Sequence, residues 1–449
     1  MFRPSIPLAL LLVVLGAISA SLPGRAAAQS LGTAPPVALE ARLSTPLVPA
    51  GQTTTAYLRV KLDGRALEMA TRPPMNVAIV IDKSGSMQGQ KIERAREAAR
   101  RAVDKLAPDD IVSIVAYDTT VRVVAPATKA SDKGPLYAGI RSIEAGGDTA
   151  LFAGVTKGAA EVRKFRERGR VNRVILLSDG LANVGPSTPS ELGALGATLM
   201  REGISVTTFG LGLGYNEDLM TSLSRQSDGN HAFIEDAADL SHFFDLELGT
   251  AAAVVANDIE IRLDCGDGVR PLRVVGRPAE IVGSHVTTSM NQIYAGQSQQ
   301  LVLEVELAPG LSGESRRVSH VQVTYGNLAA RTTEQLETDA SASFTGDRMA
   351  VENATDRDVM VSAIEQIANE QNVLAVNLRD RGNVDEARTL LRKNAAYLDD
   401  NNRRYKAPSL LKLKTSNEED SENLEGDNWN RQRKAMRKKQ LQTELQQMY

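Results

Sequence analysis

Several things that the sequence lacks narrow the classes of protein to consider. Among its 449 residues there is one cysteine, Cys265, so no intramolecular disulfide can form, and the 4 histidines are scattered rather than grouped for zinc. Aromatic residues make up 4% of the chain, too few for surfaces that stack bases or sugars. The formal net charge of -3 does not favour nucleic acid as a partner. The hydrophobic share of 42% and the charged share of 24% are those of a soluble globular protein.

Long hydrophobic runs are also scarce, and the most evident one lies at the start of the chain. Arg3 precedes a nearly unbroken apolar run over residues 6–20, and three alanines at residues 26–28 supply the small side chains that a signal peptidase recognises. We therefore predict a signal peptide over residues 1–28 and a periplasmic, secreted or cell-surface protein. The run is about 15 residues long, short of the roughly 20 that span a bilayer. Whether it is cleaved or kept as an anchor stays open, and we expect no membrane span after it.

Alternating polar and apolar residues at two places predict β-strands that belong together. Residues 37–73 contain two such stretches around a turn at residues 49–51, and residues 255–346 contain several more. Two strands are too few to bury a face by themselves. We therefore predict that the first pair joins the later strands in one β-sandwich, and that the region between them is an inserted domain.

The inserted region, residues 76–249, has a different pattern. Runs that are apolar throughout, at residues 76–82, 111–118 and 173–180, alternate with helical stretches. Continuous apolar strands separated by helices are typical of a mainly parallel sheet that is covered on both faces. The expected fold is a doubly wound, Rossmann-like α/β domain, in which ligands bind at the carboxyl ends of the strands.

The end of the chain changes pattern twice more. Residues 347–402 have helical periodicity with a turn at residues 382–383, which predicts a helical hairpin. Residues 406–449 lose that periodicity, and their acidic residues cluster ahead of their basic ones. Such segregated charge is typical of a solvated, disordered tail. Its basic segment, residues 431–439, is a possible contact for a membrane or a partner.

Oxygen-bearing side chains occur at the places where strand ends should meet. The first apolar run ends in Asp82, with Ser84 and Ser86 two and four residues further on. A later run ends in Asp179, and Thr149 lies in a loop that leads into a predicted helix. No sulfur or imidazole is among these donors. Oxygen-only ligation suits a hard divalent cation, Mg²⁺ first, with Mn²⁺ or Ca²⁺ as substitutes.

The pattern Asp82-x-Ser84-x-Ser86, with Thr149 and Asp179, resembles the metal-ion-dependent adhesion site of von Willebrand factor type A domains of bacteria and of integrin I domains. The resemblance covers the whole inserted region. It implies that the two serines and the threonine coordinate the metal, that Asp82 is a ligand or a near neighbour, and that Asp179 acts from behind the direct ligands. It also implies that a carboxylate from an Asp or Glu of a protein partner fills the open coordination position.

We therefore predict an exported adhesion or scaffold protein that binds a protein partner through the metal and is not an enzyme. One alternative is a metal-independent structural or assembly component of a cell-envelope complex. That alternative would predict the loss of one or more site residues, and all five are present. A metal-dependent hydrolase is the other alternative, but the sequence has no HExxH, GxSxG or Walker A motif and no suitable general base beside the site.

Overall fold

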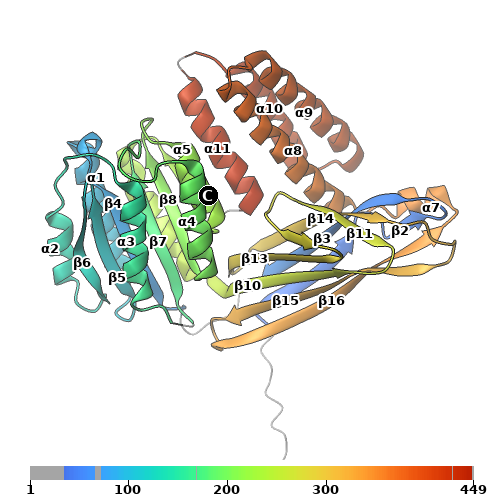
Figure 1. The fold of residues 1–449 in the computed structure, drawn as a ribbon, viewed down its shortest axis with the longest axis horizontal. Coiled ribbons are helices and arrows are strands. Elements are labelled where there is room, and N and C mark those ends of the chain that lie inside the picture. The colour runs from blue at the N-terminus through green and yellow to red at the C-terminus, as the bar shows by residue number, and fades with distance from the viewer. Residues whose placement is uncertain (1–34, 66–71, 168, 427, 447–449) are drawn as a thin grey trace, which may run out of the picture. The chain divides into compact units, whose positions relative to one another are not determined.

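The computed structural model describes residues 35–65, 72–167, 169–426 and 428–446. The predicted signal peptide, residues 1–28, lies outside these ranges. Within them the chain forms an α/β domain, a β-sandwich and a group of C-terminal helices (Figure 1). Across these described residues, the helices are all too short or too polar to cross a membrane.

The α/β domain is built on a six-stranded sheet with the order β6-β5-β4-β7-β8-β9. Neighbouring strands are parallel, except that β6 pairs antiparallel with β5. The strands are β4 (Met75–Asp82), β5 (Ile111–Tyr117), β6 (Val121–Lys129), β7 (Val171–Ser178), β8 (Ile204–Leu211) and β9 (His231–Ile234). Every residue of β4, β5, β7 and β8 is buried, which explains their mainly apolar sequences. The predicted doubly wound, mainly parallel sheet is confirmed.

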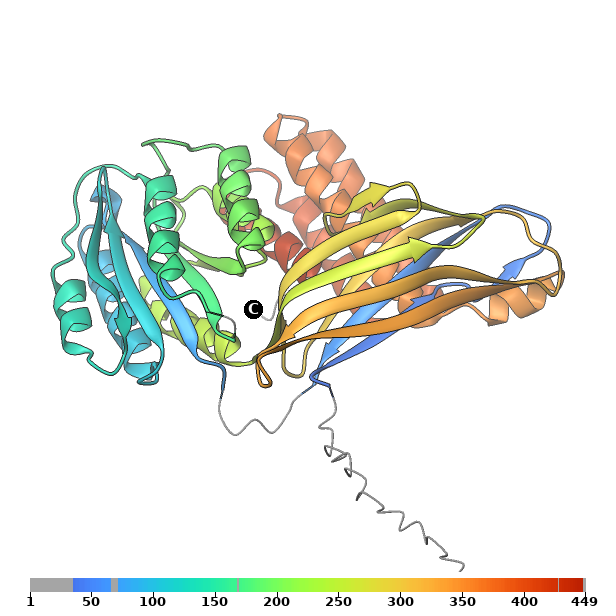
Figure 2. The same cartoon turned by 60° about the horizontal axis from the view of Figure 1, so that its bottom comes forward.

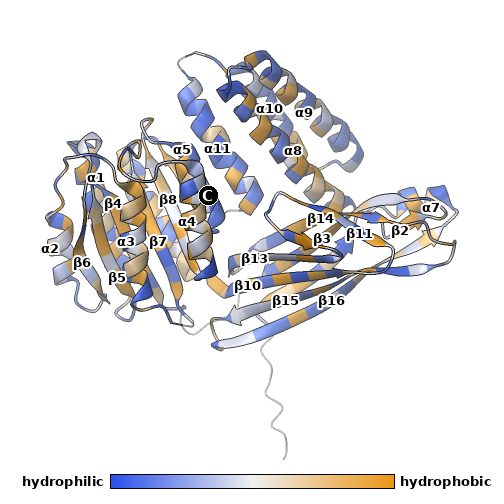
Figure 3. Cartoon of the chain, in the orientation of Figure 1, coloured by the Kyte–Doolittle hydropathy of each residue, from blue (hydrophilic) through white to orange (hydrophobic). Residues whose placement is uncertain are grey.

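Helices cover both faces of this sheet (Figure 1 and Figure 2). Apolar residues of α1, α2 and α6 share one core with the sheet, and those of α3, α4 and α5 share the other. The helices are α1 (Gln90–Lys105), α2 (Gly134–Arg141), α3 (Leu151–Arg163), α4 (Pro189–Arg201), α5 (Glu217–Gln226) and α6 (Leu240–Ala252), with short 3-10 turns η1 (Gly85–Met87) and η2 (Ala237–Asp239). Figure 3 shows the strands between them as hydrophobic over most of their length. The edge elements β6, α2 and β9 were not expected from the sequence.

The sandwich consists of two sheets, with the strand orders β1-β3-β14-β11 and β12-β13-β10-β15-β16-β2. The first strands of the chain and the later ones meet where β3 pairs antiparallel with β14. The strands are β1 (Val37–Leu43), β2 (Leu47–Pro49), β3 (Thr54–Gly64), β10 (Val254–Cys265), β11 (Val269–Val275), β12 (Glu280–Val282), β13 (His285–Tyr294), β14 (Ser298–Leu307), β15 (Ser315–Asn327) and β16 (Thr332–Thr345). The predicted insertion of the α/β domain into a sandwich is confirmed.

Five helices follow the sandwich in the described part of the chain. They are α7 (Arg348–Asn353), α8 (Arg357–Asp380), α9 (Val384–Tyr405), α10 (Pro408–Glu422) and α11 (Trp429–Leu445). The predicted hairpin corresponds to α8 and α9, which join at the predicted turn. Gly382 in this turn has a φ of +89°, a conformation that side chains other than glycine rarely adopt.

The expected disorder of residues 406–449 is wrong for their described part, which forms α10 and α11. Leu410, Leu424 and Met436 are buried in the helical bundle, so the segment contributes to a core. The charged residues also find partners within the chain. Arg431 pairs with Glu235, Arg433 with Asp380, Lys434 with Glu217, and Arg437 with Asp218. Four basic side chains of this segment are thus paired with acidic ones of the same chain, and the expected contact of the segment with a membrane or partner stays a prediction.

A buried ion pair lies where the α/β domain meets the sandwich. Residues 36–449 form one compact unit, and within it Arg173 of β7 has none of its surface exposed. Its guanidinium pairs with Glu247 of α6 at 2.5 Å and donates to the hydroxyl of Tyr294 in β13 at 3.0 Å. It also contacts the side-chain oxygen of Gln292 in the same strand. This arginine therefore connects the sheet that carries the predicted site with the sandwich.

Candidate metal centre

The predicted site residues lie at one edge of the α/β sheet, where its parallel strands end. Asp82 is the last residue of β4, and Asp179 follows the last residue of β7. These two strands are hydrogen-bonded neighbours, so their carboxyl ends adjoin. Thr149 comes from the loop that precedes α3. The topology thus gathers chain segments that are far apart in the sequence at the edge where α/β domains bind ligands.

The three predicted hydroxyl ligands converge on Gly180. A Cβ atom built on this glycine would lie 3.1 Å from Oγ of Ser86, 3.3 Å from Oγ1 of Thr149 and 3.8 Å from Oγ of Ser84. The two serine oxygens are themselves 3.1 Å apart. Three hydroxyl oxygens from two loops therefore surround a single point, and the glycine leaves that point free of a side chain.

The two predicted carboxylates lie behind these hydroxyls, and hydrogen bonds occupy both of their oxygens. Asp82 is fully buried; it accepts from the backbone N–H of Ser84 at 2.8 Å and from the hydroxyl of Ser178 at 2.6 Å. Burial raises the pKa of Asp82, and the hydrogen bonds from Ser178 and Ser84 offset only part of this shift. Asp179 accepts from the hydroxyl of Ser86 at 2.6 Å and contacts the ammonium of Lys91 with its other oxygen.

This donor set fits a hard divalent cation. Hydroxyl oxygens from Ser84, Ser86 and Thr149 are the available direct ligands, and the two carboxylates supply negative charge through the groups that they hold. Oxygen donors of this kind suit Mg²⁺, Mn²⁺ or Ca²⁺ better than soft metals. Across the described residues there is no cluster of three or more His, Cys, Asp and Glu side chains that could form a different metal site.

The loop that carries Thr149 is fixed by its neighbours. The backbone N–H of Thr149 donates to the side-chain oxygen of Asn183 at 2.8 Å, and the N–H of Asn183 donates to the carbonyl of Thr149 at 3.2 Å. On the other side, the N–H of Gly85 donates to the carbonyl of Gly147 at 2.9 Å. Gly147 has a φ of +78°, and a Cβ there would lie 2.9 Å from Oγ1 of Thr119, so this position requires glycine.

Sequence reasoning missed three contributors to the site: Lys91, Ser178 as a donor to Asp82, and Asn183. Asn183 carries no local signal, because it acts on a loop 34 residues away. Lys91 does have a local sequence signal, because a basic residue in the first turn of a helix is unfavourable unless an anion lies nearby. Two other polar residues near this edge have local roles. Asn216 caps α5 with its side chain, and Asp148 is exposed and accepts a hydrogen bond from the Asn183 side chain.

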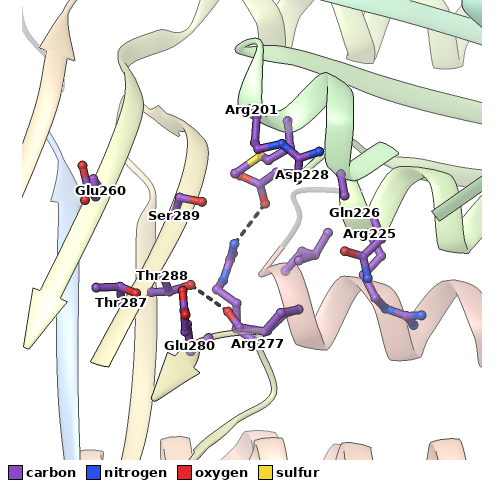
Figure 4. A pocket seen from close by; sticks show the side chains of 15 residues that line it. Arg201, Arg225, Gln226, Asp228, Glu260, Arg277, Glu280, Thr287, Thr288 and Ser289 are labelled. Carbon is purple, nitrogen blue, oxygen red and sulfur yellow. Dashed lines mark hydrogen bonds and ion pairs between the residues drawn. The ribbon is translucent and has the colours of Figure 1, made fainter. Parts of the chain in front are cut away.

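A cavity of about 490 Å³ lies away from this edge, between the α/β domain and the sandwich (Figure 4). Its lining includes α4 and α5 residues on one side and residues around β12 and β13 on the other. Arg277 reaches across it to Asp228 at 3.1 Å, and Arg225 pairs with Glu444 at 2.7 Å. The charges of these two arginines are therefore matched by carboxylates of the same chain.

Comparison with known proteins finds a family model that matches the α/β domain. The family model of the von Willebrand factor type A domain matches residues 76–246. An uncharacterized protein of Synechocystis sp. is 29% identical over 192 residues, which are 43% of this chain and 45% of that protein. Inter-alpha-trypsin inhibitor heavy chain H4 of Homo sapiens is 32% identical over 163 residues, which are 34% of this chain and 17% of that protein. The chain therefore spans less than half the length of these relatives.

Two solved structures share the fold beyond this domain. A von Willebrand factor type A protein from Catenulispora acidiphila has a TM-score of 0.67 at 19% identity, over 85% of this chain and 90% of that chain. The ArnB paralog VWA2 from Sulfolobus acidocaldarius has a TM-score of 0.63 at 19% identity, over 90% of this chain and 98% of that chain. At this level of identity the likeness establishes the fold alone.

Proposed function

We propose that this protein is an exported adhesion or scaffold protein that binds a protein partner through a divalent cation, since residues 76–246 match the family model of the von Willebrand factor type A domain. The observation that carries the proposal is the convergence of the Ser84, Ser86 and Thr149 hydroxyls beside Gly180, with both carboxylates held behind them. Domains of this family commonly mediate protein–protein interaction.

The need for an outside ligand follows from the charges of the direct donors. The hydroxyls of Ser84, Ser86 and Thr149 are neutral, and a cation held mainly by neutral oxygens keeps a strong attraction for an anion. An Asp or Glu carboxylate of the partner would complete the coordination and form a charge-assisted contact. The partner is therefore a protein that presents an accessible carboxylate, with Mg²⁺ as the first choice of cation.

Binding, rather than catalysis, is the activity that the surroundings of the site favour. Asp82 and Asp179 both have their two oxygens engaged by hydrogen bonds or an ion pair. Neither is positioned to take a proton from a water on the metal, as a general base must. The five intact donors in turn favour this proposal over a metal-independent structural component. Export is proposed from the predicted signal peptide, and the sandwich positions the binding domain.

The test is Mn²⁺ binding measured by electron paramagnetic resonance on metal-stripped protein. The matched variant is Ser84→Ala with Thr149→Val, which removes two donors while nearly keeping the shape of the side chains. We expect the wild type to bind Mn²⁺ and the double variant to bind it at least about tenfold more weakly, because the two lost ligands together cost more than about 1.4 kcal/mol. Acetate should then displace water from the Mn²⁺ of the wild type, seen as a fall in water-proton relaxation.

Equal uptake of Mn²⁺ by the two proteins would overturn the metal site and leave the metal-independent component as the better explanation. Uptake by the wild type without any response to acetate would instead overturn the carboxylate bridge. Fractionation of cells that produce the full chain with a C-terminal tag tests the proposed export separately, and recovery in the cytoplasm would contradict it.

A further inference from the structure

We propose that Lys91 makes the binding of the cation and of an external carboxylate mutually dependent, so that neither binds tightly without the other. This inference rests on the proposed function and adds the residue that controls it. Lys91 is not a ligand of the cation in this proposal. It is a positioning residue that acts on Asp179 and on the charge balance of the site.

The first observation is a direct contact. The ammonium of Lys91 meets one carboxylate oxygen of Asp179, and the Ser86 hydroxyl donates to the other at 2.6 Å. The side chain of Asp179 is fully buried, whereas that of Lys91 is 39% exposed. Lys91 thus covers the buried carboxylate from the solvent side. With both oxygens engaged, Asp179 influences the cation through the Ser86 oxygen and does not bind it directly.

The second observation is the unfavourable place of Lys91 in its helix. It is the second residue of α1, where the helix dipole is positive and acidic side chains are preferred. Gly89, the residue before the helix, provides no side-chain cap for the free N–H groups there. A lysine at this position costs stability unless an anion lies beside it. Asp179 is that anion, so the contact offsets a cost that a neutral side chain would not incur.

The third observation is the balance of charge. The carboxylates of Asp82 and Asp179 together match the two charges of a divalent cation, and Lys91 then leaves one positive charge in excess. One external carboxylate cancels that excess. The next charged pair, Lys83 and Asp118, is in contact and neutralises itself. Asp148 is exposed to solvent, which screens its charge.

Mutual dependence follows from this balance. Without an external carboxylate, the cation must bind close to an ammonium group and is repelled by it. Without the cation, Asp82 and Asp179 outweigh Lys91 by one negative charge, which repels an external carboxylate. Each ligand therefore strengthens the binding of the other, and thermodynamic linkage requires the two effects to be equal. Removing the charge of Lys91 should strengthen the binding of the cation when no external carboxylate is present. It should also weaken the coupling between the cation and the carboxylate.

The experiment measures Mn²⁺ affinity by electron paramagnetic resonance with and without saturating sodium acetate, at ionic strength matched with chloride. Lys91→Gln is compared with the wild type and with Lys105→Gln. Lys105 lies in the last turn of the same helix and forms a partly exposed ion pair with Asp245. At 1.5 Å per residue it is roughly 21 Å from Lys91, so it controls for the change in net charge.

In the wild type and in Lys105→Gln, acetate should tighten Mn²⁺ binding about tenfold, the order expected for one unit charge beside a partly solvated cation. Lys91→Gln should bind Mn²⁺ about tenfold more tightly than the wild type without acetate, and acetate should add less than about twofold. Lys91→Met, which keeps the aliphatic part of the side chain, provides the same comparison if Lys91→Gln does not fold.

The outcomes separate this inference from the proposed function. An equal effect of acetate in the wild type and in Lys91→Gln would overturn the role of Lys91 while leaving the metal site intact. Weaker Mn²⁺ binding by Lys91→Gln without acetate would also overturn it, because it would show that Lys91 supports the cation directly. If the wild type bound no Mn²⁺ under either condition, the proposed function itself would fail.

Discussion

The hydroxyl of Ser86 donates a 2.6 Å hydrogen bond to the buried carboxylate of Asp179. This bond connects the segment that follows β4 with the segment that follows β7. It also orients the serine, because a hydroxyl whose hydrogen points at a carboxylate turns its lone pairs elsewhere. Those lone pairs, together with the oxygens of Ser84 and Thr149, face the space beside Gly180. The Asp179 carboxylate thus orients the Ser86 hydroxyl, which is a neutral ligand. Through the hydrogen bond it also adds negative charge to the serine oxygen.

Gly180 gives a selective way to block the site. A methyl group in Gly180→Ala would stand within 3.8 Å of all three hydroxyl oxygens. The φ of this glycine lies outside the left-handed region, so alanine brings no backbone strain. We expect Mn²⁺ affinity to fall at least about tenfold, while the melting temperature stays within about 3 °C of the wild type. Paramagnetic resonance and thermal unfolding measure the two quantities.

The matched control for this variant is Gly146→Ala in the neighbouring loop. A Cβ there has no atom within 4 Å, and this glycine also has an ordinary φ. Its affinity for Mn²⁺ should equal that of the wild type. A loss of affinity as large as in Gly180→Ala would mean that any added methyl group disturbs these loops, and the argument from the three hydroxyls would not hold.

Arg433 should hold the C-terminal helix against the α/β domain. It contacts Glu217 and pairs with Asp218 at 2.5 Å and with Asp380 at 2.7 Å, so it connects α5, α8 and α11. Arg433→Ala would leave these partly buried carboxylates short of a counter-charge, at a cost of about 2 kcal/mol. We expect faster proteolysis and faster hydrogen exchange within α11.

Arg431→Ala is the control for this prediction, since it removes the same type of side chain from the same helix. Arg431 pairs with Glu235, and both side chains are more than half exposed. Exposed pairs of this kind contribute little to stability. If α11 were equally protected from proteolysis and hydrogen exchange in the two variants, apolar packing, and not Arg433, would keep the helix in place.

The fold could be predicted from the sequence where the signal is local. The apolar run of β4 predicted a strand buried on both faces, because burial acts on each residue of the strand itself. The site could be predicted for the same reason: Asp82, Ser84 and Ser86 follow one another within five residues at the end of that strand. The sequence alone also indicated the loop of Thr149, since it leads directly into a helix.

What could not be predicted depends on distant partners. The basic residues of α11 pair with acidic residues of α5 more than 200 positions earlier, as Lys434 does with Glu217. Taken locally, that charge indicated a solvated tail, and the structure shows a packed helix. Lys91 was overlooked for a related reason. Its place in the first turn of α1 is unfavourable in isolation, and only the position of Asp179 across the site explains it.

Asp420 should make the C-terminal bundle less stable as pH rises. Burial in α10 raises the pKa of Asp420 from its usual 3.8 to about 6, although Lys439 and the hydrogen bond from Gln432 oppose the shift. The folded protein therefore binds this proton more tightly than the unfolded chain does. The resulting stability is full below pH 3.8 and is lost as pH rises through about 6, with a total of roughly 2–3 kcal/mol.

Asp420→Asn should remove this dependence, because the amide stays neutral and its oxygen can still accept from Gln432. We expect the variant to melt at a higher temperature than the wild type at pH 7.5, and the difference to shrink at pH 4.5. Glu418→Gln, on the same helix but exposed, should leave the pH dependence of melting as it is in the wild type. An unchanged pH dependence in Asp420→Asn would contradict the prediction.

Glu247 should be the most sensitive charged residue at the junction between the α/β domain and the sandwich. Its carboxylate is fully buried, pairs with Arg173 at 2.5 Å, and accepts hydrogen bonds from Thr207 at 2.6 Å and Asn230 at 3.0 Å. Glu247→Gln would leave the buried guanidinium without this counter-charge. Breaking a buried pair from one side costs roughly 3–5 kcal/mol. We therefore expect a fall of several degrees in the melting temperature.

The control for this prediction is Glu260→Gln, which removes an exposed partner of Arg262 and should change the melting temperature by less than about 1 °C. A similar small effect for both variants would mean that the hydrogen bonds of the Arg173 guanidinium to β13 are sufficient to hold the junction.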